Sequence, residues 1–162
     1  MGTAIILIKL IAAHLVGDFI LQTDKMCADK SSNNRSVRYR ALAEHAVVQA
    51  ALAYLFVAQW NNWFVPLAIG VSHFLIDLVK VHFKRMTFVG FICDQLAHYC
   101  VIIALWFLIF ANHDYNPAAE QFSANFWLVA TAYIAVLSPT SILIKSFIEY
   151  EKWLPTDASL KG

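Results

Sequence analysis

Long apolar segments alternate with short polar ones along most of the chain. Five stretches approach the length of a helix that crosses a bilayer, and they cover about residues 3–22, 41–60, 64–82, 88–110 and 126–150. Their apolar residues run continuously and do not alternate with polar ones, which is typical of membrane helices and not of transmembrane β-strands. The pattern therefore predicts an all-α fold, in which residues 1–162 form a single polytopic membrane domain of five transmembrane helices.

The composition supports the same class of protein. The chain is 60% hydrophobic and 14% charged, whereas a soluble domain usually carries about 25% charged residues. We therefore expect the lipid bilayer as a partner. The net charge of +1 gives no indication of a nucleic-acid partner, and we expect none.

Basic residues indicate how the predicted helices are oriented. Only one of the 12 lysines and arginines, Lys9, lies within the apolar part of the predicted bundle. The other eleven fall at one end of it, and they are Lys25, Lys30, Arg35, Arg38, Arg40, Lys80, Lys84, Arg85, Lys145, Lys152 and Lys161. The connections at 61–62 and 111–125 have none. The positive-inside rule therefore predicts an N-terminus outside and a cytoplasmic C-terminus.

Histidine and aspartate recur at a spacing of four residues inside the apolar stretches. The pairs are His14 with Asp18, His73 with Asp77 and, in reverse order, Asp94 with His98, and a further stretch contains His45. Residues four apart lie on the same face of a helix, roughly 6 Å apart along its axis. In the predicted topology all these side chains lie in the cytoplasmic half of the membrane. We call this set the His/Asp cluster, and its seven members are His14, Asp18, His45, His73, Asp77, Asp94 and His98.

Such residues are costly in a membrane and therefore predict a site. An aspartate near the centre of a membrane helix costs about 2.5–3.5 kcal/mol, so the three aspartates need partners inside the bundle. Imidazoles and carboxylates match the ligand preferences of Zn²⁺, which we favour, and of Mn²⁺ or Fe²⁺. We expect all seven residues to be metal ligands for one ion, or for two ions bridged by a carboxylate. The three expected catalytic groups are Asp18, Asp77 and Asp94.

Three neighbouring polar residues are expected to support the ligands. Gln22 lies one helical turn beyond Asp18, and Gln95 adjoins Asp94. Lys80 lies three residues after Asp77 on the same helix face, where it could hold an anionic substrate or extend to the membrane surface.

The segment His14-Leu-Val-Gly-Asp-Phe-Ile-Leu-Gln22 resembles the H-L-x-G-D-F-x-L-Q signature of a family of bacterial and phage integral membrane proteins known as a domain of unknown function. The segments around His45, His73–Lys80 and Asp94–His98 resemble other blocks of that family. More distantly, the chain is similar to SOS-regulated membrane-bound metal-dependent hydrolases. The resemblance implies a multi-pass protein of the bacterial inner membrane.

Three functions remain open from the residues. The first is a metal-dependent hydrolase, in which bound Zn²⁺ supplies a hydroxide nucleophile near neutral pH. Its substrate would be a lipid-like or small-molecule ester, phosphoester or amide at the cytoplasmic leaflet. The second is a transporter or channel for divalent metals or protons, although the outer half of the bundle is mostly apolar. The third is a non-catalytic membrane module with a structural metal. The stretch 126–150 has no ionisable residue in its core, so we expect a scaffold or a homo-oligomer contact there.

Overall fold

The computed structural model describes residues 2–82, 88–110 and 122–137, together with 140, 143–144 and 147–148. Within these residues the chain is helical and has no strand. The elements in order are α1 (Gly2–Val16), the π-helical turn η1 (Gly17–Leu21), α2 (Asp24–Lys30), α3 (Arg35–Val57), α4 (Phe64–His82), α5 (Phe88–Ile109) and α6 (Ala124–Leu137).

Four described segments are long and apolar enough to cross a bilayer, and they are Thr3–Leu21, Arg35–Val57, Phe64–His82 and Phe88–Ile109. The predicted all-helical fold is therefore confirmed, and the first four predicted spans correspond to helices that are long and apolar enough to cross a membrane. The fifth expected span, 126–150, overlaps α6, which has 14 residues, and most of 138–150 lies outside the described residues. A fifth crossing and the sidedness of the bundle remain predictions.

The predicted limits of the second span, 41–60, were wrong at both ends. Helix α3 begins at Arg35, because the Asn34 side chain accepts a hydrogen bond from the Ser36 backbone N–H (3.0 Å) and caps the polar first turns. It ends at Val57, because Ala58 adopts a left-handed backbone conformation with φ 55°. The apolar pattern marks the part of a helix that lipid can surround, and helix ends depend on capping.

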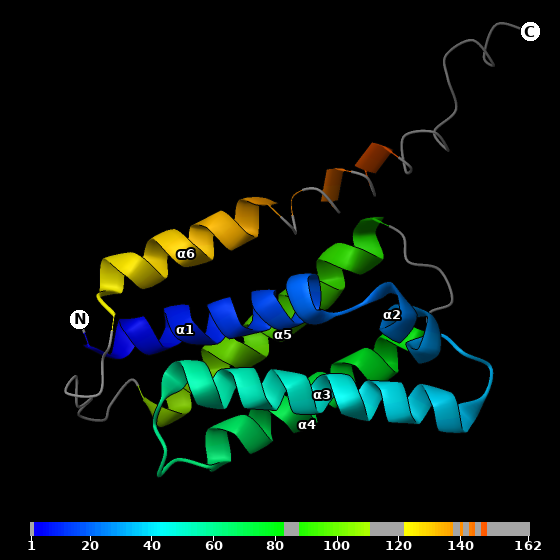
Figure 1. Ribbon diagram of the computed structural model, residues 1–162, viewed down its shortest axis with the longest axis horizontal. Coiled ribbons are helices and arrows are strands. Elements are labelled where there is room, and N and C mark those ends of the chain that lie inside the picture. The colour runs from blue at the N-terminus through cyan, green and yellow to red at the C-terminus, as the bar shows by residue number, and fades with distance from the viewer. Residues whose placement is uncertain are drawn as a thin grey trace, which may run out of the picture.

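The predicted polar loop between the first two spans also contains a helix. Thr23 caps α2 by accepting a hydrogen bond from the Met26 backbone N–H (3.2 Å). Helix α2 packs against α3 and lies at the end of the bundle where α1 finishes and α3 starts (Figure 1).

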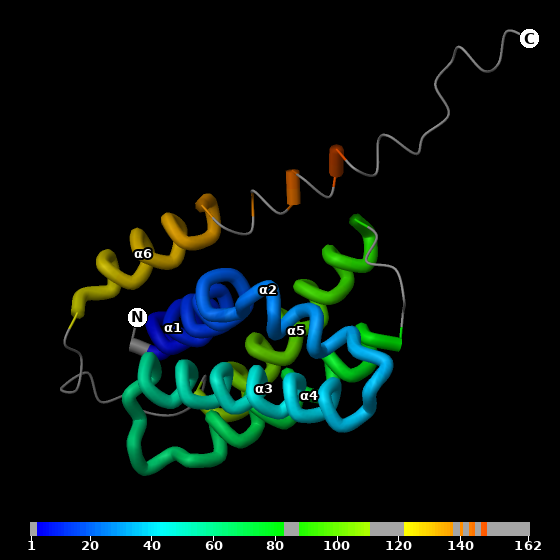
Figure 2. Tube along the Cα trace, turned by 45° about the vertical axis from the view of Figure 1, so that its right-hand side comes forward, coloured from blue at the N-terminus to red at the C-terminus, as the bar shows by residue number. Residues whose placement is uncertain are grey.

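Helices α1, α3, α4 and α5 form an up-and-down bundle (Figures 1 and 2). Helix α1 packs against α3 and α5, and α4 packs against the same two helices. Helix α6 lies along the outside of α1. The end of the bundle away from α2 is filled by large apolar side chains, including Ile5, Ile6, Leu10, Val65, Ile69, Ile102 and Phe110.

The bundle buries polar side chains and exposes apolar ones. Val47, Leu75, Leu96 and Leu108 are each more than half exposed, while His45 is 1% exposed. This distribution is the reverse of a soluble domain, and it is what a helix bundle surrounded by lipid requires.

Candidate metal centre

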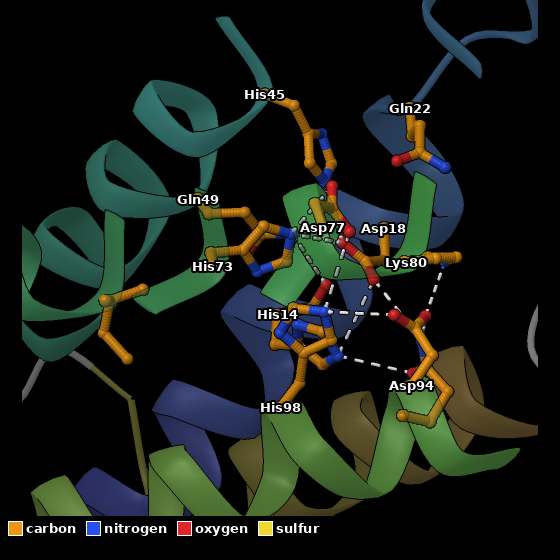
Figure 3. Close-up of polar contacts among 12 residues, drawn as sticks. His14, Asp18, Gln22, His45, Gln49, His73, Asp77, Lys80, Asp94 and His98 are labelled. Atoms are coloured by element: carbon orange, nitrogen blue, oxygen red, sulfur yellow. Dashed lines mark hydrogen bonds and ion pairs between the residues drawn. The ribbon is translucent and has the colours of Figure 1, made fainter. Parts of the chain in front are cut away.

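All seven members of the His/Asp cluster meet inside the bundle, in the half near α2 (Figure 3). Helix α1 and its continuation η1 supply His14 and Asp18, and α3 supplies His45. The remaining pairs come from α4 and α5. Every side chain of the cluster is less than a tenth exposed.

Helix direction explains why one pair is reversed in sequence. Helices α1 and α4 run toward the α2 end of the bundle, whereas α5 runs away from it (Figure 1). Histidine therefore precedes aspartate in the first two helices and follows it in α5, so that like groups reach the same depth. The imidazoles of His14, His73 and His98 lie one helical turn farther from the α2 end than the aspartates of the same helices.

Asp18 is the centre of one half of the cluster. Its Oδ1 atom accepts a hydrogen bond from Gln49 Nε2 (2.6 Å) and lies 3.0 Å from His45 Nε2 and 3.4 Å from His73 Nε2. Its Oδ2 atom faces His14 Nε2 at 3.8 Å and accepts a hydrogen bond from Gln95 Nε2 (3.4 Å).

His98 is the centre of the other half. Its Nε2 atom lies 3.8 Å from Asp77 Oδ1 and 3.7 Å from Asp94 Oδ1. The second oxygen of each aspartate is bound to a lysine at 2.5 Å: Lys30 donates to Asp77 Oδ2 and Lys80 donates to Asp94 Oδ2. Each aspartate thus directs one oxygen toward a lysine ammonium group and the other toward the imidazole of His98.

The π-helical turn and Gly17 place Asp18 at the centre of this network. A single π-turn inside a helix is frequent at functional sites, and here it begins at Gly17, directly before Asp18. A Cβ atom on Gly17 would lie 2.5 Å from Gln49 Cδ and 2.8 Å from Gln49 Oε1. Glycine is therefore needed for the buried Gln49 amide to reach Asp18.

The donor set fits a transition metal. Ligand atoms bound to Zn²⁺ at about 2.0–2.2 Å lie roughly 3.3–3.6 Å apart in a tetrahedral arrangement, and the distances of 3.4–3.8 Å within the cluster are close to this spacing. Among the described residues, several buried polar atoms lack a hydrogen-bond partner, and His45 Nδ1 is one of them. Three others belong to the cluster and face its other members, namely His73 Nε2, His98 Nε2 and Asp94 Oδ1. Unsatisfied buried polar atoms are rare and costly, and a coordinated cation would satisfy all three.

A small cavity borders the imidazoles on the side away from the carboxylates. It has a volume of about 10 Å³, and the residues that line it include His14, Gln49, Ser72, His73 and His98. This volume is enough for roughly one water molecule. Leu10, Ile69 and Ile102 line the same cavity, and they belong to the apolar core that fills the opposite end of the bundle.

The three supporting residues expected from sequence have different roles in the structure. Gln95 contacts the cluster directly, since its Oε1 atom lies 3.3 Å from His14 Nε2. Lys80 pairs with Asp94, and its Nζ atom lies 2.5 Å from Asp94 Oδ2. Gln22 contacts Lys30, the partner of Asp77: it accepts a hydrogen bond from Lys30 (2.7 Å) and donates one to Cys27 Sγ (3.1 Å).

Sequence reasoning missed Lys30 and Gln49. Gln49 lies four residues after His45 on the same helix face, so the spacing that identified the His/Asp pairs could have found it. Lys30 lies in the polar stretch between the first two predicted spans, where nothing in the sequence indicated burial, yet it is buried and pairs with Asp77. The Thr23 cap signal could have predicted α2, but the docking of α2 onto the bundle has no local sequence signal.

Residues 6–142 match the family model described as a protein of unknown function (DUF3307). The chain belongs to this family. The match covers every member of the His/Asp cluster as well as Lys30, Gln49 and Lys80. No curated protein and no solved structure is similar enough to the chain to count as a match.

Proposed function

We propose that this member of the family is a membrane-embedded, metal-dependent hydrolase that acts at the cytoplasmic leaflet. The observation that carries the proposal is the convergence of four imidazoles and three carboxylates from separate helices, with three buried atoms that lack a hydrogen-bond partner. A Zn²⁺-type ion at such a site supplies a hydroxide nucleophile from bound water.

The charge of the cluster favours a bound cation. With neutral imidazoles, the three carboxylates exceed the two paired lysines, Lys30 and Lys80, by one negative charge. Excess buried charge is costly in a low-dielectric interior. A divalent ion removes the negative excess, and the remaining positive charge then stabilises a hydroxide.

The surroundings favour hydrolysis over transport. A permeation path would continue through the end of the bundle away from α2, yet that end is filled by packed apolar side chains such as Leu10, Ile69 and Ile102. The cluster instead has its most exposed edge at Lys80, whose side chain is 29% exposed. This geometry favours a site that opens to one side only.

The proposal is tested by metal analysis of the purified protein together with hydrolysis assays on ester, phosphoester and amide substrates. We expect a divalent transition metal to co-purify with the protein and its removal by a chelator to abolish turnover. Asp77→Asn should lower turnover at least 100-fold, whereas the matched change Asp29→Asn, in α2 and outside the cluster, should not. His73→Ala and His82→Ala form a second matched pair, because only His73 belongs to the cluster.

A protein that binds no divalent metal at micromolar concentrations while remaining folded would contradict the proposal. Metal-dependent ion flux in proteoliposomes without turnover would replace it with transport. Loss of the fold on chelation, with no turnover in the metal-bound form, would replace it with a structural metal.

A further inference from the structure

We propose that the His/Asp cluster is a two-metal site whose substrate is a phosphate monoester. The inference rests on the proposed hydrolase function and deepens it by fixing the number of ions and the chemical class of the substrate. The number of ions is argued from the way the ligand atoms divide into groups, and the substrate class is argued from the charge of the cluster.

Three groups of side chains present ligand atoms within 4.8 Å of one another. They are His14 with His73 and His98, Asp18 with His45 and His73, and Asp77 with Asp94 and His98. The first group shares His73 with the second group and His98 with the third. One histidine nitrogen atom binds one ion, so the first group cannot hold an ion at the same time as either of the others if the shared histidines use the same nitrogen atoms. The other two groups share no residue.

The largest number of ions that the described ligand groups can hold at once is therefore two. We name the first set site A, made of Asp18, His45 and His73, and the second set site B, made of Asp77, Asp94 and His98. Both sets contain three protein ligands, which leaves coordination positions for water and substrate, as in catalytic metal sites. His14 belongs to neither set.

Sites A and B are adjacent. The His73 and His98 rings stack with their centroids 4.1 Å apart. Asp77 reaches both sets, because its Oδ2 atom lies 3.8 Å from His73 Nε2 and its Oδ1 atom lies 3.8 Å from His98 Nε2. Hydrolytic two-metal sites hold their ions about 3.5–4 Å apart. Asp77, whose Oδ2 atom also accepts the hydrogen bond from Lys30, would be the carboxylate that can contact both ions.

The charge of a two-metal site selects the substrate. Two divalent ions change the net charge of the cluster and its two lysines from one negative to three positive. A metal-bound hydroxide and a dianionic phosphate monoester together neutralise these three charges. A single ion with its hydroxide would already be neutral and would favour an uncharged ester or amide.

The reaction that follows is the hydrolysis of a phosphate monoester. The hydroxide oxygen bonds to phosphorus, the bond between phosphorus and the ester oxygen breaks, and that oxygen leaves as the alcohol with a proton from water. The net reaction consumes one water molecule and releases inorganic phosphate. Lys80, at the most exposed edge of the cluster, is placed to attract the incoming dianion.

The first test counts metal ions per chain, after chelation and reloading with Zn²⁺, in the purified full-length protein. We expect two ions in the wild type, one in the site A variant His45→Ala and one in the site B variant Asp94→Ala. The exposed control His82→Ala should retain two. One ion in the wild type, or the loss of both ions in each site variant, would overturn the two-metal site.

Reloading with Mn²⁺ gives a readout that does not depend on activity. Two Mn²⁺ ions about 4 Å apart are magnetically coupled, so the wild type should show a coupled electron paramagnetic resonance spectrum. His45→Ala and Asp94→Ala should each show the six-line spectrum of an isolated ion. An uncoupled spectrum from fully loaded wild type would overturn the adjacency of the sites.

The second test compares para-nitrophenyl phosphate, vesicles containing phosphatidic acid, and para-nitrophenyl acetate. Phosphate release from the soluble ester or from the vesicles supports the substrate class, and the two arms distinguish a soluble source from a lipid. Turnover of the acetate alone overturns the substrate class and leaves the hydrolase function in place. Two coupled ions with no turnover of any substrate would overturn the hydrolase function and its substrate, but not the two-metal site.

Discussion

Lys30 is only 7% exposed although its neighbours in the sequence are polar. Its ammonium group lies between Asp77 Oδ2 (2.5 Å) and Gln22 Oε1 (2.7 Å). The Lys30 ammonium and the Asp77 carboxylate are both buried away from water, so each offsets the desolvation cost of the other. Lys30 thereby joins the short helix α2 to the candidate metal ligands of α4.

This dependence predicts an asymmetric effect of mutation. Lys30→Met leaves Asp77 buried without its cation and should lower the free energy of unfolding of the chelator-treated protein by roughly 3–5 kcal/mol. The double variant Lys30→Met/Asp77→Asn should recover most of that loss, because no unpaired charge remains. The measurement is denaturant unfolding in detergent micelles.

Lys25→Met is the matched control, since the Lys25 side chain is 86% exposed and its loss should cost less than about 0.5 kcal/mol. Equal destabilisation by the single and double variants would show that the ion pair is not what stabilises this region.

The contrast between Lys30 and Asp77 shows which residues a sequence can identify. Asp77 could be predicted because a carboxylate is costly in an apolar stretch that is long enough to cross a bilayer, so its presence there indicates a function. Lys30 could not, because a lysine among polar residues is ordinary and its burial depends on how α2 docks. Gln49 falls between these cases. Its spacing of four residues from His45 was informative, but an uncharged glutamine costs less free energy in a membrane helix than an aspartate and so draws less attention.

The π-helical turn η1 is the element that depends most on tertiary packing. The apolar pattern predicted an uninterrupted helix over 3–22, and the chain is α-helical only to Val16 before the turn at Gly17–Leu21. Helix propensity carries no signal for such a turn, because the same residues would extend an α-helix. The contact between Gly17 and Gln49 of α3 is the local reason for the small residue there.

We expect Gly17→Ala to destabilise the protein by about 1–3 kcal/mol through overpacking against Gln49. The same change in a Gln49→Ala background should cost much less, because the crowded amide is absent. The double-mutant cycle is measured by denaturant unfolding.

Gly70→Ala is the control, because its Cβ would meet Ala50 Cβ at 3.1 Å and the Ala46 carbonyl oxygen at 3.3 Å, and neither contact involves the Gln49 side chain. Its cost should be nearly independent of the residue at 49. If Gly17→Ala were equally costly in both backgrounds, Gln49 would not be the reason for glycine at this position.

At the scale of the whole molecule, the bundle divides into a polar half and an apolar half along its length. The imidazoles, the carboxylates and their partners Lys30 and Lys80 occupy the half near α2. The other half holds the apolar core and one buried lysine, Lys9, whose ammonium group lies 5.3 Å from the centre of the Trp127 ring. The sequence could predict this division because helix direction and basic-residue positions together gave each polar residue a depth. It could not predict how helices pair around the bundle, since that depends on contacts between distant segments.

The same division gives a testable orientation. If the α2 end faces the cytoplasm, the exposed Cys27 of α2 should react with a membrane-impermeant maleimide only from the cytoplasmic side. Cys93 and Cys100 are exposed on α5, so both are first changed to serine.

Asn61→Cys, in a background in which Cys27 is also changed to serine, is the matched probe for the opposite end, since Asn61 is exposed between α3 and α4. Sealed right-side-out vesicles should label Asn61→Cys and protect Cys27, and inverted vesicles should give the reverse. The opposite result would place the metal ligands near the outer surface. In that case the substrate would be met outside the cytoplasm, although the geometry of sites A and B would be unchanged.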